Sequence, residues 1–153
     1  FPYTTLFRSF FLSYFLSFTY LSIAHQQKYI EDSSIKTIAG FLNSTGGNLL
    51  CGVSDSGEIV GLNDEIKSFY KSSDAFLLHV KNIVKQRIGT EFYPFVNFKL
   101  HNLDDQLILE FTCAESTSPV FVDEIDFYVR TNPATDKLEG RKLHEYISNK
   151  FKK

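Results

Sequence analysis

The chain has 153 residues, of which 43% are hydrophobic and 22% are charged. This balance excludes a disordered polymer, and the length fits one domain with a single core. The formal net charge is −2, so the chain lacks the overall basic excess of a non-specific nucleic-acid binder, and any such surface must be a local patch. Cys51 and Cys113 lie far apart without CxxC spacing. This predicts buried reduced thiols, with neither a metal site nor a disulfide framework. We expect a cytoplasmic protein.

The first residues do not follow the pattern of a folded domain. Residues 1–9 match the in-frame translation of a common sequencing adapter, and such a scar carries no information about the native fold. The following stretch, residues 10–24, carries no charge. We interpret it as bases that were misread or translated out of frame beside the adapter. The alternative is a signal peptide, since the stretch is short for a membrane span. We therefore treat residues 1–30 as an unreliable leader and predict no membrane segment.

After the leader, the apolar spacing predicts a helix, a strand and a hairpin. The helix begins at a capping segment, residues 32–34, and ends at the glycine pair 46–47. Its inward face carries residues at positions i, i+3, i+4 and i+7, namely Ile35, Ile38, Ala39 and Leu42. Residues 48–53 predict a central strand covered on both faces. A turn at residues 55–57 then leads into a returning strand at residues 58–62.

The second half of the chain predicts two more helices and several strands. One helix is capped by Ser73 and ends at Gly89. The last helix covers about residues 139–150. Between them, alternating apolar residues predict four strands, at residues 94–100, 107–111, 119–122 and 126–131. The sequence thus predicts one α+β domain over residues 31–153, with a small mixed or antiparallel sheet and about three helices packed on it.

Common catalytic and cofactor motifs are absent from the sequence. It contains no GxxxxGK[ST], HExxH or GxSxG motif, and its four histidines are scattered. The pair Gly46 and Gly47 follows a helix and precedes a strand, whereas a phosphate-binding loop has the reverse order, with the anion at a helix N-terminus. We therefore predict no cofactor and no metal site.

Two segments of the sequence resemble a known family. The first is IAGFLNSTGGNLLCGVSDSG at residues 38–57, followed by IVGL at residues 59–62. The second is DFYVRTN at residues 126–132, followed by a helix from residue 140. Together they resemble the two signatures of the Schlafen-type, Alba-like (AlbA) domain, and the resemblance covers about residues 31–150. It implies an Alba-like fold with a strand upstream of the first signature, which we expect this chain to lack.

The resemblance also implies a function. Members of this family are described as DNA-binding, some were once described as divergent ATPases, and some Schlafen proteins cleave RNA with metal-holding acidic residues. Two of those acids lie in an upstream E-x4-E element, and the third follows the GV strand, where this chain has Asp55. Residues 1–30 contain no Asp or Glu, and phosphodiester hydrolysis needs several convergent carboxylates. Catalysis is therefore unsupported, and we lean against an enzyme.

The residues expected to contact nucleic acid lie in or near the two signatures: Asn43, Gly46, Gly47, Arg130, Arg141 and Lys142. Each has a simpler interpretation. Asn43 is also a good helix C-cap, the glycines suit tight turns, and Asp55 suits a turn. Arg130 lies in the middle of a strand, where it meets either a phosphate, an internal carboxylate or open solvent. Arg141 and Lys142 also fit an ordinary solvated helix face.

The sequence therefore predicts a nucleic-acid-binding module of a larger bacterial regulatory or defence protein. One alternative is the truncated or degenerate core of a metal-dependent endoribonuclease. A second is a nucleotide-binding (ATP-binding) or protein-interaction domain. The sequence does not show whether the target is DNA or RNA. It also leaves open whether a second copy of the chain is a partner. Fusion to further domains is expected.

Overall fold

The computed structural model describes residues 3–6 and 19–152, with side chains from Gln27 onward. Its helices are α1 (Thr19–Leu42), α2 (Asn63–Glu65), α3 (Ser73–Arg87) and α4 (Gly140–Lys150), with a π-helical turn η1 (Ile66–Tyr70) and a 3-10 turn η2 (Thr90–Phe95). Its strands are β1 (Tyr3–Leu6), β2 (Gly47–Cys51), β3 (Val96–Leu103), β4 (Gln106–Cys113), β5 (Phe121–Val122), β6 (Asp126–Arg130) and β7 (Thr135–Leu138).

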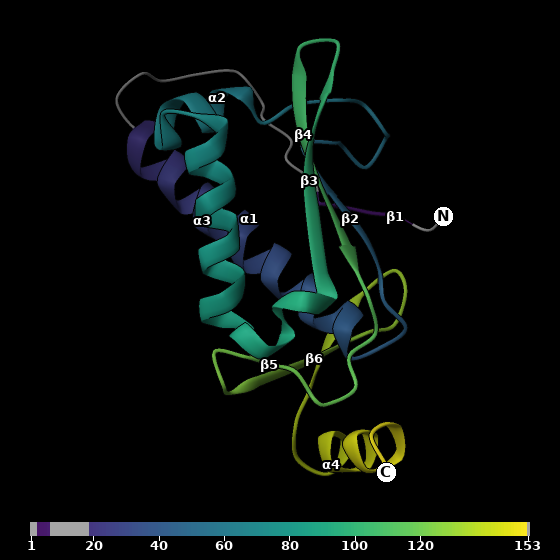
Figure 1. The fold of residues 1–153 in the computed structure, drawn as a ribbon. Helices are drawn as coiled ribbons and strands as arrows, with labels where there is room; N and C mark the ends of the chain where they lie inside the picture. The colour runs from purple at the N-terminus through teal and green to yellow at the C-terminus, as the bar shows by residue number, and fades with distance from the viewer. Residues whose placement is uncertain (1–2, 7–18, 153) are drawn as a thin grey trace.

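The strands form two sheets, which Figure 1 shows on either side of the C-terminal end of α1. The first sheet has the order β1-β2-β4-β3, with β1 parallel to β2 and the other pairs antiparallel. The second sheet has the order β5-β6-β7 and is antiparallel throughout. The predicted α+β fold is confirmed, with the strands divided over two sheets instead of one.

Helix α1 is longer than the sequence pattern predicted. The expected start at residues 32–34 is wrong, because the helix already begins at Thr19. The polar side chains of that segment are satisfied within the fold instead of capping a helix. The Asp32 carboxylate forms an ion pair with Arg87 of α3. The Ser34 hydroxyl donates a hydrogen bond to the Ile30 carbonyl, 2.7 Å away and one turn earlier, a bond that serine makes inside helices.

Strand β1 lies within the adapter-like residues. It pairs in parallel with β2, from Tyr3 opposite Asn48 to Leu6 opposite Cys51. This is the upstream position at which the family resemblance implies a strand. Residues 10–18 of the charge-free stretch lie outside the described residues, and the domain boundary at residue 31 stays a prediction.

The predicted hairpin after β2 is not a pair of strands. Residues 58–62 form only one isolated bridge, between Val53 and Ile59. Gly52 and Gly61 have φ values of +93° and +81°, and the amides of Val60 and Gly61 both donate to the Gly52 carbonyl at 2.9 Å. The backbone therefore forms a compact loop here, because these two glycines turn the chain out of the extended conformation.

The core lies between the first sheet and the two long helices. Figure 1 shows α1 and α3 on the same face of this sheet. Its buried residues come from α1, β2, α3 and β4, and include Ile35, Ile38, Leu42, Leu49, Val84, Leu109 and Phe111. The second sheet extends this core with Val120, Val122 and Tyr128. Both cysteines are buried and unpaired, as predicted. Within the described part of the chain, no helix is long and apolar enough to cross a membrane.

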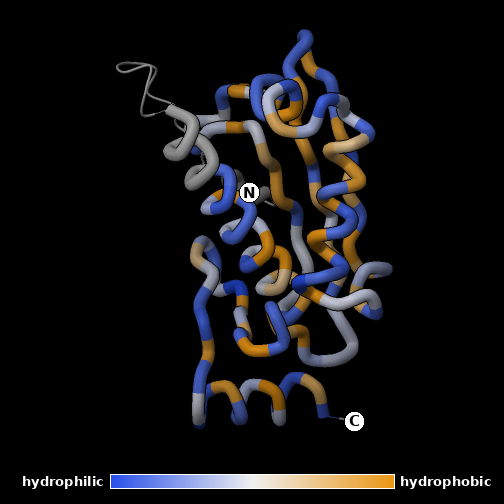
Figure 2. The backbone as a smooth tube through the Cα atoms, turned by 90° about the vertical axis from the view of Figure 1, so that its left-hand side faces the viewer, coloured by the Kyte–Doolittle hydropathy of each residue, from blue (hydrophilic) through white to orange (hydrophobic). Residues whose placement is uncertain are grey.

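Helix α4 is attached to the outside of the second sheet. The ring of Tyr146 packs edge-on against Phe127 of β6, with 5.8 Å between the ring centroids. The Tyr146 hydroxyl donates a hydrogen bond of 2.6 Å to the Asn43 carbonyl at the end of α1. No residue of α4 is buried, and Figure 2 shows hydrophobic and hydrophilic residues alternating along it. One face of α4 therefore rests on the sheet, and the other faces solvent.

Candidate nucleic-acid interface

Asn43, the residue after α1, ties the helix to the second sheet. Its side chain is completely buried. Its amide nitrogen donates to the carbonyls of Val120 and Tyr128, at 2.8 and 2.9 Å, and its amide oxygen accepts from the Val120 amide at 2.8 Å. With both donors occupied and no surface exposed, this geometry fits a structural role. We assign Asn43 no contact with a ligand.

The glycine pair forms the tight connection from α1 to β2. The Gly46 amide donates to the Phe41 carbonyl at 2.9 Å, which closes the helix end. Gly46 has a φ of +75°, and a Cβ atom there would lie 2.5 Å from the Cys113 carbonyl oxygen. At Gly47, a Cβ atom would overlap the Phe41 ring. Both glycines therefore have structural reasons to be glycine, and the Gly46 amide is already used within the protein.

Arg130 lies at the end of β6, beside the C-terminal end of α1. Its backbone amide donates to the Ser44 hydroxyl at 2.9 Å. Its guanidinium donates to the Thr135 hydroxyl at 2.9 Å and to the Asn132 side-chain oxygen at 3.3 Å. The guanidinium carbon also lies 5.5 Å from the centre of the Phe41 ring. Ring and polar contacts together set the orientation of this cation.

The surroundings of Arg130 are only partly hydrated, since the residue is half-buried. Burial lowers the pKa of its guanidinium from the ordinary value, because desolvation disfavours the charged form. An arginine nevertheless keeps its charge at physiological pH. The protein therefore holds a partly desolvated positive charge at this position.

Arg141 and Lys142 lie on α4, away from the Arg130 end of β6. Strand β7 pairs its first residue, Thr135, with Arg130 and its last, Leu138, with Phe127. The chain therefore leaves Arg130 before α4 begins. Both cations are exposed, and Arg141 lies 3.5 Å from the Glu145 carboxylate. The structure thus separates the predicted residues into an organised site around Arg130 and two solvent-facing cations on another element.

Asp55, which the resemblance places at an acidic position, is exposed in the turn after β2. The described residues contain no group of three or more His, Cys, Asp or Glu side chains placed to hold a metal ion. The upstream segment in which the resemblance places the partner acids is residues 1–30, of which residues 1–2 and 7–18 lie outside the described part of the chain.

Besides Asn132, sequence reasoning missed three residues of the Arg130 site. Phe41 supplies the ring beside the guanidinium, while Ser44 and Thr135 accept hydrogen bonds from Arg130. Phe41 and Ser44 belong to the first signature segment and Thr135 follows the second, so their position in or next to the signatures was the available signal. Gly40 contributes by its small size, since a Cβ atom there would lie 3.5 Å from the Arg130 amide nitrogen and 3.1 Å from a Thr135 methyl group.

The two segments that meet at Arg130 are also the two signature segments. We therefore compared the chain with models of known protein families. The model of the family described as "Schlafen, AlbA_2" matches residues 21–139. The chain belongs to this family. The match of the AlbA_2 domain begins upstream of the boundary expected at residue 31, within α1.

Solved structures show a similar fold for this AlbA_2 domain. The crystal structure of the DIP2311 protein from Corynebacterium diphtheriae superposes with a TM-score of 0.57 at 16% sequence identity. The match covers 80% of this chain and 22% of that chain, so this chain spans about a fifth of the length of that protein. At this identity the similarity concerns the fold alone. A search of curated proteins finds no match.

Proposed function

We propose that this AlbA_2 domain binds nucleic acid through the phosphodiester backbone, with Arg130 as the principal cation. The observation that carries the proposal is the arrangement of Arg130 at the junction of the two signature segments. Its guanidinium is oriented by Thr135, Asn132 and the Phe41 ring. The arrangement belongs to a domain whose family is associated with nucleic acid.

The chemistry of the Arg130 site favours an anion over a neutral ligand. A guanidinium matches the geometry of two phosphate oxygens, and charge-assisted hydrogen bonds of this kind are stronger than neutral ones. Burial has already removed part of its hydration, as the lowered pKa of Arg130 indicates. A phosphate would add charge-assisted hydrogen bonds to this partly desolvated group. The hydroxyls of Ser44 and Thr135 lie beside the same group and add polar surface for a sugar-phosphate chain.

Arg141 and Lys142 have a secondary role in this proposal. They lie on the solvent-facing side of α4, and within residues 27–152 Lys142 has no ion-pair partner. Such exposed lysines and arginines attract phosphates at longer range, without the orientation that Arg130 has. The binding mode would therefore depend strongly on salt and recognise bases weakly. Because the net charge of the chain is −2, affinity for nucleic acid would come from these local cations and not from the overall charge.

The test compares binding by the wild type and the variants Arg130→Ala and Arg130→Lys. Fluorescence anisotropy with labelled single-stranded and duplex DNA and RNA is measured over a series of salt concentrations. Arg130→Ala should weaken binding at low salt and reduce the salt slope by about one for each phosphate that the variant no longer neutralises. Arg130→Lys should keep the slope and bind more weakly, because an ammonium cannot form the paired hydrogen bonds.

Lys99→Ala is the matched control, since Lys99 is an exposed cation on β3 of the other sheet. It should leave affinity and salt slope close to those of the wild type. Unchanged binding by folded Arg130→Ala would contradict the proposal. We expect no cleavage of these nucleic acids with magnesium or manganese. Cleavage that Asp55→Ala abolishes would favour the endoribonuclease alternative instead.

The proposal extends to the setting of the domain. We propose that it is one module of a larger bacterial regulatory or defence protein that acts in the cytoplasm. In support, the domain matches only 22% of the DIP2311 chain, as a module shared between longer proteins would.

A further inference from the structure

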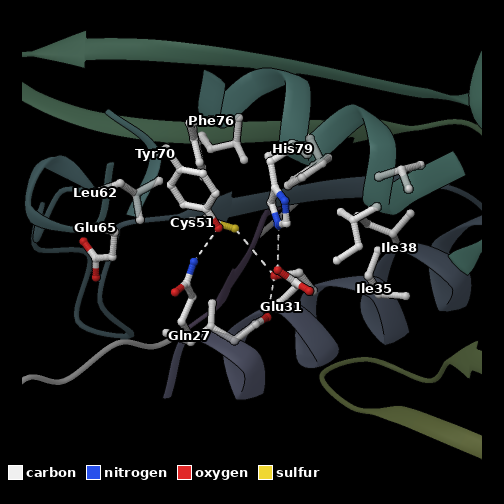
Figure 3. A pocket seen from close by; sticks show the side chains of 17 residues that line it. Gln27, Glu31, Ile35, Ile38, Cys51, Leu62, Glu65, Tyr70, Phe76 and His79 are labelled. Atoms are coloured by element: carbon white, nitrogen blue, oxygen red, sulfur yellow. Dashed lines mark hydrogen bonds and ion pairs between the residues drawn. The ribbon is translucent and has the colours of Figure 1, made fainter. Parts of the chain in front are cut away.

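A cavity lies between α1, α3 and the inner face of the first sheet, away from Arg130 (Figure 3). Its volume is about 100 Å³. Most of its wall is aliphatic or aromatic, and includes Phe76, Val80, Ile83, Val84, Leu109 and Phe111. Cavities of roughly this size with such walls bind benzene-sized molecules. The cavity therefore has the dimensions and lining of a site for one small aromatic ring.

One end of the cavity carries polar groups in two pairs. Gln27 donates from its amide nitrogen to the Tyr70 hydroxyl oxygen. One oxygen of the Glu31 carboxylate forms a hydrogen bond of 2.9 Å with His79 Nε2. Figure 3 shows both pairs at the same end of the cavity, with Cys51 between them. A polar end beside an apolar wall is the usual composition of a small-molecule site.

Each of these pairs leaves hydrogen-bonding capacity for a ligand. A phenolic hydroxyl that accepts one bond still has a hydrogen to donate, and among the described residues Tyr70 has no acceptor for it. A carboxylate has two oxygens, and only one oxygen of Glu31 bonds His79. Burial, and then the negative charge of Glu31, raise the pKa of Tyr70, so the hydroxyl keeps its proton at physiological pH. The cavity thus offers one donor and one acceptor close together.

We propose that this cavity binds a small hydroxylated aromatic molecule, with phenol as the simplest member of the class. The ring would lie among the apolar side chains of α3 and the sheet. The ligand hydroxyl would donate to Glu31 and accept from Tyr70, which uses both of its hydrogen-bonding functions. A purely hydrocarbon ring of the same size would leave the Tyr70 hydroxyl hydrogen and the second Glu31 oxygen without a hydrogen bond, which is costly in a partly buried site. This inference is independent of nucleic-acid binding.

The test compares phenol with toluene, which replaces the hydroxyl by a methyl group. Both are titrated into the intact chain and followed by the amide resonances of labelled protein. We expect phenol to bind at least as tightly as toluene, although water solvates phenol better. In Tyr70→Phe the order should reverse, with about a tenfold loss of phenol affinity for the hydrogen bond removed. Tyr93→Phe is the control, since Tyr93 does not line the cavity and should behave as the wild type.

A second variant tests the location. Val80→Phe replaces an isopropyl group by a benzyl group, which fills the cavity and should abolish binding of both compounds. If that variant does not fold, the resonances of the wild type decide, because phenol should shift amides of residues 30–38 and 76–84 most strongly. Toluene binding more tightly than phenol in the wild type, no binding of either compound, or shifts centred on another region would each overturn the proposal.

Discussion

The two sheets are held against the same helix in different ways. The first sheet meets the middle of α1 through aliphatic and aromatic side chains, and a cavity of about 100 Å³ remains in that contact. The second sheet meets the C-terminal end of α1, where Asn43 and Ser44 make four hydrogen bonds to residues of its strands and the segment before β5. Apolar contacts are non-directional, whereas hydrogen bonds require defined distances and angles.

This difference relates to what each contact does. The hydrogen-bonded contact sets the position of Arg130 relative to α1, because the Ser44 hydroxyl accepts from the Arg130 amide itself. Directional bonds suit the proposed role of Arg130, which requires its guanidinium in one orientation. The apolar contact has no such requirement, and it leaves room for the small ligand proposed above. The comparison predicts that substitutions at the two contacts will have different consequences.

The largest effect is expected at the polar contact. Asn43→Ala removes three buried hydrogen bonds and leaves the Val120 amide and the carbonyls of Val120 and Tyr128 without these partners. The free energy of unfolding should fall by about 3–5 kcal/mol. Urea unfolding measures the loss, with exposed Asn82→Ala as the control, which should change it by less than about 0.5 kcal/mol. A decrease below about 1 kcal/mol for Asn43→Ala would contradict the importance of this contact.

The turn that joins α1 to the first sheet is the next test. Gly46→Ala places a Cβ atom 2.5 Å from the Cys113 carbonyl oxygen, in a backbone with φ of +75°. Gly57→Ala is its matched control, since Gly57 has a φ of +86° but no atom within 4 Å of such a Cβ. Gly57→Ala should cost about 1 kcal/mol from the backbone alone. Gly46→Ala should cost about 3 kcal/mol in unfolding experiments, and equal losses would refute the steric argument.

The two thiols report on the apolar contact through pH. Burial raises the pKa of Cys51 to about 11 and that of Cys113 to about 12, from 9.0. Above pH 9 the unfolded chain releases protons that the folded chain retains, so stability should fall as the pH rises from about 9 to 12. Unfolding measured at pH 8 and pH 10 checks the direction. The double variant Cys51→Ala with Cys113→Ala should lose less stability between these pH values.

The smallest effect is expected at the edge of the first sheet. Deletion of residues 1–9 removes β1, which among the described strands pairs with β2 alone. Water can replace backbone hydrogen bonds at an exposed edge, so the melting temperature should change by about 2 °C or less. This deletion leaves all of α1 in place, including Gln27 beside Tyr70. A fall of roughly 5 °C or more would show that these adapter-like residues stabilise the fold.

Much of the fold could be predicted where one local signal dominates. The inward face of α1 and the burial of Leu109 and Phe111 follow from apolar periodicity alone. The start of α3 was displaced by one residue, because Ser72 and Ser73 are equally good caps and Ser72 bonds the Ala75 amide. β7 was missed, because only its pairing with β6 makes it a strand, and its side chains show no buried alternation.

The site was harder to predict than the fold, because its geometry depends on contacts between distant residues. Asn43 resembles a helix cap in the sequence, and only the position of Val120 and Tyr128 makes it a buried bridge. The first signature indicated the region of Phe41, but it could not show that this ring lies beside Arg130. Sequence reasoning therefore indicates which segments matter, while the partners of each side chain come from the tertiary structure.

Because α4 is attached at the periphery, we expect it to unfold locally before the other helices do. Its contacts described above, through Tyr146 to Asn43 and Phe127, are few, and the helix buries none of its residues. Elements with few buried contacts open locally at low cost. The amides of α4 should therefore exchange with deuterated water well before those of α1. Since Arg141 and Lys142 lie on this helix, bound nucleic acid should slow that exchange, and the last helix would act as a reporter of occupancy.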